Sequence, residues 1–473
     1  MRAYGRVMQT IEGDLRPLDA TFLELEQADD GALMHTGAAL IFDPQTQPAG
    51  TPSLEQLLAL LDQRFGLLPR FRCRLSESRV HGLRRPAWVR DDDFDLQAHV
   101  RHATLPAPGG EAELHEWLGD FWSHRLDRTR PLWEMTLVDG LERGRWMLAT
   151  KTHHAMVDGV GSMDIGHILL DTEPHPAARP ASERHDSGAA DGGAGAQLPN
   201  WLSQAVAVSQ TAVGTLRHPR RLVRAGEAAV ALGEVVWQDE IRAARHSSLN
   251  VPIGTTRRYR SVTLDLADAK RIKQALGGTV NDVILAVATG ALRRLLEHRD
   301  EALDRPLRAM VPVNLRGEDD SGLGNKVSSL FVELPVGELD RRRRYDQTRA
   351  AATALKSGPA TLGTSTVLLV AGLAPPLLHE SIAQILYGAR LFNITITNVP
   401  GPQIPLHALG SQLRRILPLV PLAADHAIGI AIVSYDGELA FGINADHATT
   451  PDLHVFEDAL REEFAALLKL ARA

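Results

Sequence analysis

The sequence predicts an α/β protein built from two units that a flexible linker joins. The chain has 473 residues, more than one hydrophobic core ordinarily supports, so two domains are expected. Patterns typical of strands alternate with patterns typical of helices on both sides of residues 175–200. That segment is rich in Ala, Gly, Pro, Ser and Asp, which together bury little apolar area. We therefore expect a first domain over 17–174, a linker over 175–200 and a second domain over 201–473.

In the first unit, apolar residues recur at the helical spacing in three segments, such as Leu54, Leu57 and Leu61 in one of them. Asp19 is suited to cap the first of these helices. Residues 68–75 alternate apolar and basic side chains, as a half-buried strand with a solvated arginine face would. We expect helices at 18–26, 53–65, 111–123 and 163–170, and strands at 38–42, 68–75, 135–138 and 145–152.

The second unit starts with a helix-like stretch, 201–237, that carries Arg217, Arg220, Arg221 and Arg224. These arginines fit either a solvated helix face or a patch at a membrane surface. The rest of the unit continues the alternation of strands and helices. We expect strands at 259–266, 308–315, 328–334, 393–397, 427–434 and 438–444, and helices at 267–276, 283–296 and 452–470.

Composition argues against several classes of function. Hydrophobic residues at 44% and charged residues at 23% are globular values, and the net charge of −7 argues against a nucleic-acid-binding protein. Cys73 is the single cysteine, so neither an intramolecular disulfide nor a cysteine-based metal site is expected. Acidic and basic residues interrupt positions 1–19, which argues against a secretory signal. The most apolar run, 367–378, is too short to span a bilayer, and we expect a cytoplasmic protein.

The strongest functional signal lies at 150–161, where a predicted strand enters a tight turn and then a helix. His153 and His154 end the strand, and Asp158 and Gly159 follow in the turn. A neutral imidazole has an ordinary pKa of about 6.5 and is a usable base near neutral pH. Neighbouring strand residues point to opposite faces, so one histidine should be the base and the other should anchor the loop. A lone histidine at a strand end is usually structural, but the whole string favours a catalytic loop.

This string resembles the His-His-x-x-x-Asp-Gly signature of the coenzyme-A-dependent acyltransferase superfamily. More narrowly, the chain resembles the bacterial wax ester synthase/diacylglycerol acyltransferase family from about Pro17 to its C-terminal region, the linker excepted. Several other segments carry the same resemblance in the same order. They are Pro17-Leu18-Asp19 with Phe22-Leu23, Pro131-Leu132-Trp133, Asn281-Asp282, residues 311–316 with Gly324-Asn325, residues 398–402, and Asp446.

The resemblance implies two similar chloramphenicol-acetyltransferase-like domains around a central tunnel. It implies that His154 is the general base, that His153, Asp158 and Gly159 support the loop, and that acyl-CoA is a co-substrate with no further cofactor. An arginine is a candidate partner for Asp158. Asn281 could also be a buried helix cap, Trp133 a core aromatic, Pro131 a strand-entry residue, and Asn398 part of a turn. The candidates for the tunnel are Asn281, Asp282, Pro131, Leu132, Trp133 and Asn398.

The implied reaction moves a long fatty acyl group from acyl-CoA to diacylglycerol or to a fatty alcohol. One alternative is an acyltransferase of the same superfamily that uses another alcohol acceptor or another donor. A second alternative is a lipid-binding protein that keeps the fold without turnover. Cys73 lies far from the histidines in sequence and gives no reason to propose a thiol nucleophile. Hydrophobic substrates leave contact with a membrane or a lipid body open.

Overall fold

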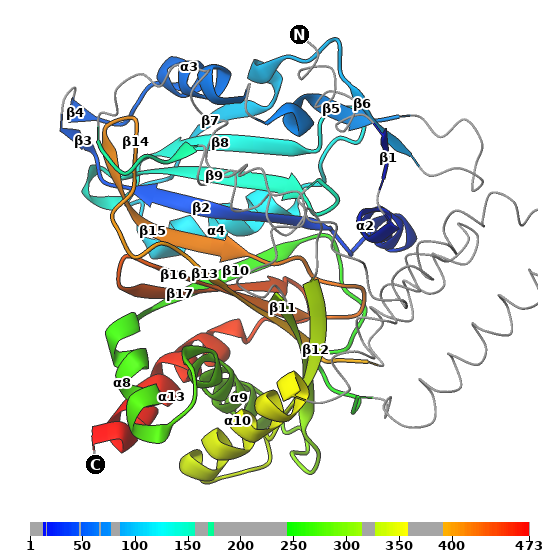
Figure 1. Ribbon diagram of the computed structural model, residues 1–473, viewed down its shortest axis with the longest axis vertical. Helices are drawn as coiled ribbons and strands as arrows, with labels where there is room; N and C mark the ends of the chain where they lie inside the picture. The colour runs from blue at the N-terminus through cyan, green and yellow to red at the C-terminus, as the bar shows by residue number, and fades with distance from the viewer. Residues whose placement is uncertain are drawn as a thin grey trace, which may run out of the picture. The chain divides into compact units, whose positions relative to one another are not determined.

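The computed structural model describes residues 13–15, 17–46, 49–65, 68–76, 86–156, 169–174, 244–314, 327–357 and 391–472. These residues belong to one compact unit, in which two six-stranded sheets carry helices (Figure 1). The predicted α/β class with two sheet-rich domains is confirmed. The linker over 175–200 and the predicted helix over 201–237 lie outside the described residues, as does most of the helix predicted at 163–170.

The first sheet has the strand order β14-β15-β2-β9-β8-β7. The central strands β2 and β9 are antiparallel, and His35 of β2 lies opposite His153 of β9. One face of the sheet packs on α3, and the other packs on α4, which also contacts the second sheet through β10. The bounds are β2 His35–Phe42, β7 Val100–Thr104, β8 Trp133–Asp139, β9 Trp146–His153, α2 Pro17–Ala28, α3 Leu54–Phe65 and α4 Glu111–Ser123.

Two strands from late in the chain complete this first sheet. They are β14 (His407–Ala408) and β15 (Ser411–Leu419), and β15 pairs antiparallel with β2. The indole nitrogen Nε1 of Trp146 donates to the hydroxyl Oγ of Ser411 at 3.0 Å, which joins β15 to the core of the sheet. The first sheet is therefore assembled from both halves of the sequence.

The second sheet has the strand order β10-β17-β16-β13-β11-β12, and four helices pack together beside it (Figure 1). Helix α9 forms the centre of this layer because nearly all of its first four turns are buried. The strands are β10 Arg257–Asp265, β11 Leu307–Asn314, β12 Val327–Leu334, β13 Ile394–Pro400, β16 Ile428–Tyr435 and β17 Glu438–Asp446. The helices are α8 Leu266–Leu276, α9 Val280–His298, α10 Arg341–Ser357 and α13 Leu453–Arg472.

Smaller elements complete the described part of the chain. A three-stranded sheet has the order β1-β6-β5, and β3 pairs with β4 as a ribbon. The strands are β1 Gly13–Asp14, β3 Gln45–Thr46, β4 Ala49–Gly50, β5 Cys73–Leu75 and β6 Ala87–Arg90, and the 3₁₀ turns are η1 Pro69–Arg72, η2 Leu96–Ala98 and η3 Glu142–Gly144.

Two local predictions were wrong. Residues 68–75 do not form one strand, because Pro69 opens the 3₁₀ turn η1 and only Cys73–Leu75 continue as β5. Proline has no backbone N–H to offer a strand ladder, and its fixed φ suits the first position of a helical turn. Asp19 does not cap α2 but lies within its first turn, because the helix already begins at Pro17.

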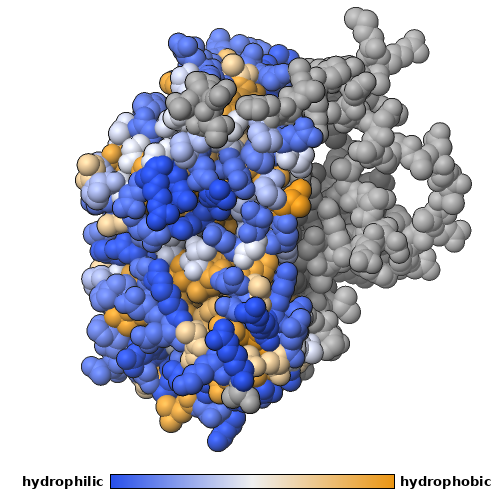
Figure 2. Space-filling view, turned by 90° about the vertical axis from the view of Figure 1, so that its left-hand side faces the viewer, coloured by the Kyte–Doolittle hydropathy of each residue, from blue (hydrophilic) through white to orange (hydrophobic). Residues whose placement is uncertain are grey.

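The surface combines mostly polar cover with local apolar zones. On the face shown in Figure 2, hydrophilic residues dominate, and hydrophobic residues gather over the middle and lower part. Across the described residues, no single helix is both long and apolar enough to cross a bilayer. Helices α8 and α9 meet that measure only when taken together, and they are bent by 96° at the break between them.

Candidate active site

Strand β9 delivers both histidines of the predicted motif to one turn. The eight residues of β9 are all buried, and the backbone N–H of His153 donates to the carbonyl of Leu132 at 2.9 Å. The chain then turns, and the N–H of Met156 donates to the carbonyl of His153 at 2.9 Å. The N–H of His154 donates to the carbonyl of Met34 at 2.8 Å, which ties the turn to the start of β2.

The side chain of His153 points into the protein and is 1% exposed. Its Nδ1 accepts the backbone N–H of Ala155 at 3.1 Å, so the ring proton belongs on Nε2. That Nε2 lies 3.5 Å from Oε2 of Glu26, which is an electrostatic contact and longer than a hydrogen bond. Burial lowers the pKa of His153, and the neighbouring Glu26 only partly opposes this effect. His153 is therefore a neutral anchor for the turn.

Glu26, on helix α2, is the carboxylate behind the histidine pair and is 1% exposed. Its Oε2 accepts hydrogen bonds from Nε and Nη2 of Arg128, at 3.1 and 2.6 Å. Its Oε1 accepts the N–H of Met34 at 3.3 Å. Burial alone would raise the pKa of Glu26, but His153 and Arg128 outweigh it and lower the pKa to about 2. Glu26 is therefore ionised throughout the neutral range.

His154 has different surroundings. Its ring is half-buried and stacks on Phe22 of α2, with centroids 4.0 Å apart and planes 28° apart. Burial lowers the pKa of His154 to about 4, which a hydrogen bond with its own backbone carbonyl partly opposes. Within the described residues, Nδ1 is buried and has no other hydrogen-bond partner. In the neutral ring one nitrogen is unprotonated, and that nitrogen can accept a proton at pH 7.

The other predicted residues of this domain fall into two groups. Leu132 and Trp133 are buried in the core beside β9, and Nε1 of Trp133 donates to the carbonyl of Phe71 at 2.8 Å. They support the strand that ends in His153, and Pro131 directly precedes them. Asp158 and Gly159 lie outside the described residues, so their role in the loop stays a prediction.

In the second domain, two predicted residues come together. Nδ2 of Asn398, on β13, donates to Oδ1 of Asn281 at the start of α9, at 3.4 Å. Asp282 caps the same helix, since its Oδ2 accepts the N–H of Thr279 at 2.7 Å and Thr279 Oγ1 accepts the N–H of Asp282 at 3.2 Å. None of the contacts found among the described residues joins these side chains to His154. Their predicted place along a tunnel stays a prediction.

Local patterns did not reveal the residues behind the histidines. Glu26 and Phe22 lie four positions apart on α2, which places them on one face of the helix, but their partners are distant in sequence. Local patterns also did not show that Lys151, within β9, is fully buried. Its Nζ lies 2.5 Å from Oε1 of Glu134 and donates to the carbonyl of Phe121 at 2.8 Å. The sequence signal for this residue was a single lysine inside a predicted strand.

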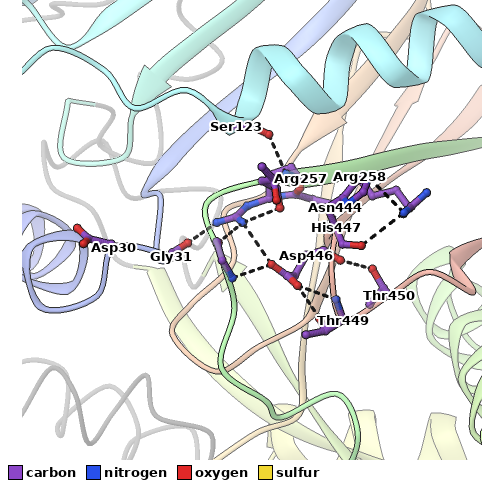
Figure 3. Close-up of polar contacts among 12 residues, drawn as sticks. Asp30, Gly31, Ser123, Arg257, Arg258, Asn444, Asp446, His447, Thr449 and Thr450 are labelled. Atoms are coloured by element: carbon purple, nitrogen blue, oxygen red, sulfur yellow. Dashed lines mark hydrogen bonds and ion pairs between the residues drawn. The ribbon is translucent and has the colours of Figure 1, made fainter.

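A second buried cluster lies around Arg257 of β10 and Asp446 of β17 (Figure 3). The guanidinium of Arg257 donates to the carbonyl of Gly31, in the segment between α2 and β2, and to that of Gly254 at 2.6 Å. Its backbone N–H donates to Oγ of Ser123, at the end of α4, at 2.7 Å. The arginine therefore links the second sheet to two elements that pack on the first.

Asp446 completes this cluster from the neighbouring strand. Its Oδ1 lies 3.9 Å from Nη1 of Arg257 and accepts the N–H of Gly254 at 2.8 Å. Its Oδ2 accepts the N–H and the hydroxyl of Thr449 at 2.9 and 2.8 Å. Burial lowers the pKa of Arg257 to about 10, although Asp446 acts in the opposite direction, so the arginine stays charged at neutral pH. Asp446, predicted as part of a motif, thus belongs to a buried structural pair.

Comparison with known proteins identifies related chains. The model of the wax ester synthase/diacylglycerol acyltransferase catalytic domain matches residues 15–284, and that of the WS/DGAT C-terminal domain matches residues 323–468. The probable diacylglycerol O-acyltransferase tgs2 of Mycobacterium tuberculosis is 33% identical over 451 residues, covering 93% of this chain and 95% of its own. The probable diacylglycerol O-acyltransferase tgs1 of the same species is 31% identical, covering 97% and 96%.

Solved structures show the same arrangement. The wax ester synthase/diacylglycerol acyltransferase from Marinobacter aquaeolei VT8 has a TM-score of 0.68 and 26% identity, covering 98% of this chain and all of its own. The starter condensation domain of rhizomide synthetase RzmA has a TM-score of 0.56 at 14% identity, covering 99% and 96%. At that identity, the second likeness concerns the fold alone.

Proposed function

The chain belongs to the wax ester synthase/diacylglycerol acyltransferase family, and we propose that it is an O-acyltransferase that moves a long-chain fatty acyl group from acyl-CoA to a lipid alcohol. With diacylglycerol as acceptor the product is triacylglycerol, and with a fatty alcohol it is a wax ester. The observation that carries the proposal is the half-buried, neutral imidazole of His154 at the end of β9. The ring of Phe22 stacks on it, and the neighbouring His153 faces the carboxylate of Glu26.

The proposed reaction is direct transfer with His154 as general base. Nε2 of His154 accepts the hydroxyl proton as the acceptor oxygen attacks the thioester carbonyl. The carbon–sulfur bond then breaks, the proton passes to the leaving thiolate, and the products are the ester and free coenzyme A. Holding both substrates beside one base supplies much of the rate enhancement, so neither an acyl-enzyme nor a further cofactor is required. Asp158 and Gly159 are proposed to hold the loop that follows the base.

The place of action is part of the same proposal. Both the lipid alcohol and the product are hydrophobic, and they partition into membranes or lipid bodies rather than water. We propose that the enzyme meets them from the cytoplasmic side, resting on the inner membrane face or on a lipid body. Vesicle flotation with and without diacylglycerol would measure this contact, and protein that stays at the bottom of the gradient in both cases would contradict it.

The test of the reaction uses purified protein, palmitoyl-CoA and, separately, dioleoylglycerol or hexadecanol, with thiol release and lipid products both followed. We expect His154→Ala to lower kcat by about 10²- to 10⁴-fold, the usual contribution of a positioned general base. His102→Ala is the matched control, because His102 lies exposed on the edge strand β7 and pairs with Asp139 of β8. Unchanged turnover in His154→Ala would falsify the assignment of the base.

The ratio of the two products decides between triacylglycerol and wax ester synthesis. Failure of thiol release with both acceptors in the wild-type protein would favour another acceptor or donor. Binding of palmitoyl-CoA without turnover on any alcohol tested would favour the lipid-binding alternative.

A further inference from the structure

We propose that Glu26, paired with Arg128, is a positioning residue that sets the geometry of His154 through the turn that follows β9. This inference rests on the proposed function only where the enzymatic activity is measured. Glu26 does not touch the ring of His154. It acts through two routes, one through the side chain of His153 and one through the backbone of Met34.

The first route starts from helix α2. Phe22 and Glu26 are four residues apart, so they face the same way one turn from each other. Phe22 stacks on the ring of His154, and Oε2 of Glu26 faces Nε2 of His153 at 3.5 Å. One face of one helix therefore contacts both histidines. Any shift of α2 along its axis would move both contacts together.

The second route is a single peptide group. The N–H of Met34 donates to Oε1 of Glu26 at 3.3 Å, and the carbonyl of Met34 accepts the N–H of His154 at 2.8 Å. The carboxylate thus reaches the main chain of His154 through the residue that enters β2. This link fixes where the backbone of His154 begins its turn.

The charge of Glu26 also selects the form of His153. Nδ1 of His153 accepts the N–H of Ala155, which requires the ring proton on Nε2, and an anion facing Nε2 stabilises that arrangement. Arg128 supplies the counter-charge with two hydrogen bonds to Oε2 and is itself about one-third exposed. Without the anion, the ring could flip or change tautomer, and the Ala155 contact that shapes the turn would be lost.

Errors of position at a catalytic base are costly, since a displacement of about 1 Å can lower a rate by about 10²-fold. We therefore expect Glu26→Gln to lower kcat by about 10- to 100-fold, with KM for palmitoyl-CoA changed less than about threefold. The amide cannot accept from Met34, Arg128 and His153 all at once. Arg128→Gln should likewise lower kcat with little change in KM, and Arg128→Lys should recover part of the lost kcat.

The matched control is Arg125→Gln. Arg125 lies three residues before Arg128 and contacts the same segment, but through the carbonyls of Glu26 and Asp30 and the carboxylate of Asp30, not through the Glu26 carboxylate. We expect kcat and KM of this variant to stay within about twofold of the wild-type values. Circular dichroism of all variants verifies that the fold is kept.

A readout independent of activity separates this inference from the proposed function. Nitrogen-15 spectra of labelled histidine should show His153 as one neutral tautomer with the proton on Nε2, and Glu26→Gln should broaden or shift those signals. Absence of acyl transfer in the wild type would defeat the proposed function and leave this spectroscopic test in place. Unchanged imidazole signals together with unchanged kcat in Glu26→Gln and Arg128→Gln would overturn the inference. If Glu26→Gln does not fold, the same two measurements on Arg128→Gln test the inference, because the side chain of Arg128 is partly solvated.

Discussion

At the scale of single residues, His153 and His154 show how environment divides two identical side chains into two roles. Burial lowers the pKa of both, so neither carries charge at neutral pH. Both ring nitrogens of His153 face groups inside the protein: Nδ1 accepts the N–H of Ala155, and Nε2 lies 3.5 Å from the Glu26 carboxylate. His154 rests on the ring of Phe22, which holds its plane without using its nitrogens. His153 therefore serves the structure of the turn, and His154, the proposed base, keeps one nitrogen available for the substrate.

The lowered pKa of His154 predicts an unusual pH dependence. The ring can accept a proton only when neutral, so kcat/KM should stay flat as the pH falls from 8 to about 5 and decline as it passes through about 4. An ordinary histidine would impose the decline near pH 6.5. The measurement is kcat/KM for palmitoyl-CoA against pH, with circular dichroism at each pH to separate titration from acid unfolding. An inflection near pH 6.5 would show that burial does not set the pKa of His154 in the free enzyme.

At the scale of elements, the segment between α2 and β2 connects several parts of the site. Met34 lies between Glu26 and His154, and the carbonyl of Gly31 accepts from Arg257. Gly31 also lies so close to the carbonyl oxygen of Ile253 that an added methyl group would overlap with it. The φ of Gly31 is not in the left-handed region. Glycine is therefore required here for the close approach of two backbones and not for an unusual backbone angle.

Gly31→Ala should therefore destabilise the protein by roughly 1–3 kcal/mol, the usual cost of overpacking a buried contact. The control is Gly254→Ala on the facing segment, where a Cβ would lie 3.6 Å from Oδ1 of Asp446, an ordinary contact. Urea unfolding followed by tryptophan fluorescence compares the two variants with the wild type. Equal stability of the two variants would mean that the backbones can separate at no cost.

The elements also show which parts of the fold sequence patterns predict and which they miss. Helix α4 has the predicted bounds, and β9 and α9 lie within a few residues of theirs, because each shows its own periodicity. Helix α10 was not predicted, since four arginines open it and few of its side chains are buried. Strand β15 was not predicted, because its partner β2 lies far away in the sequence. The proposed base, His154, was predicted from a motif, whereas the proposed role of Glu26 depends on contacts with Arg128 and His153 that no local pattern encodes.

At the scale of the whole molecule, the pair of Arg257 and Asp446 joins the two sheets through buried charges. Both side chains are at most 2% exposed, and their hydrogen bonds reach the α2–β2 segment and the loop that follows β17. The backbone N–H of Arg257 also donates to Ser123 of α4. A buried pair of this kind adds little compared with apolar packing, but losing one partner leaves the other charge without compensation. The pair thus makes the two domains depend on each other for stability.

Arg257→Leu should lower the free energy of unfolding by about 3–5 kcal/mol, because Asp446 would remain buried as an unpaired anion. Arg271→Ala is the control, since Arg271 pairs with Asp268 on the surface of α8 and such exposed pairs contribute about 0–1 kcal/mol. Differential scanning calorimetry of both variants gives the comparison. A loss in Arg257→Leu no larger than that in Arg271→Ala would show that the pair is not needed for stability.

The late arrival of β15 has a consequence for how the protein is made. Strand β2 is translated well before the partner on its outer edge, Ser411–Leu419. Until then the nascent first sheet exposes a row of unpaired backbone groups, which can pair with neighbouring chains on the same polysome. Messages that are cut short before this strand yield chains with a permanently open edge. Residues 411–419 are therefore required to close the outer edge of β2, and chains that lack them are expected to aggregate more readily.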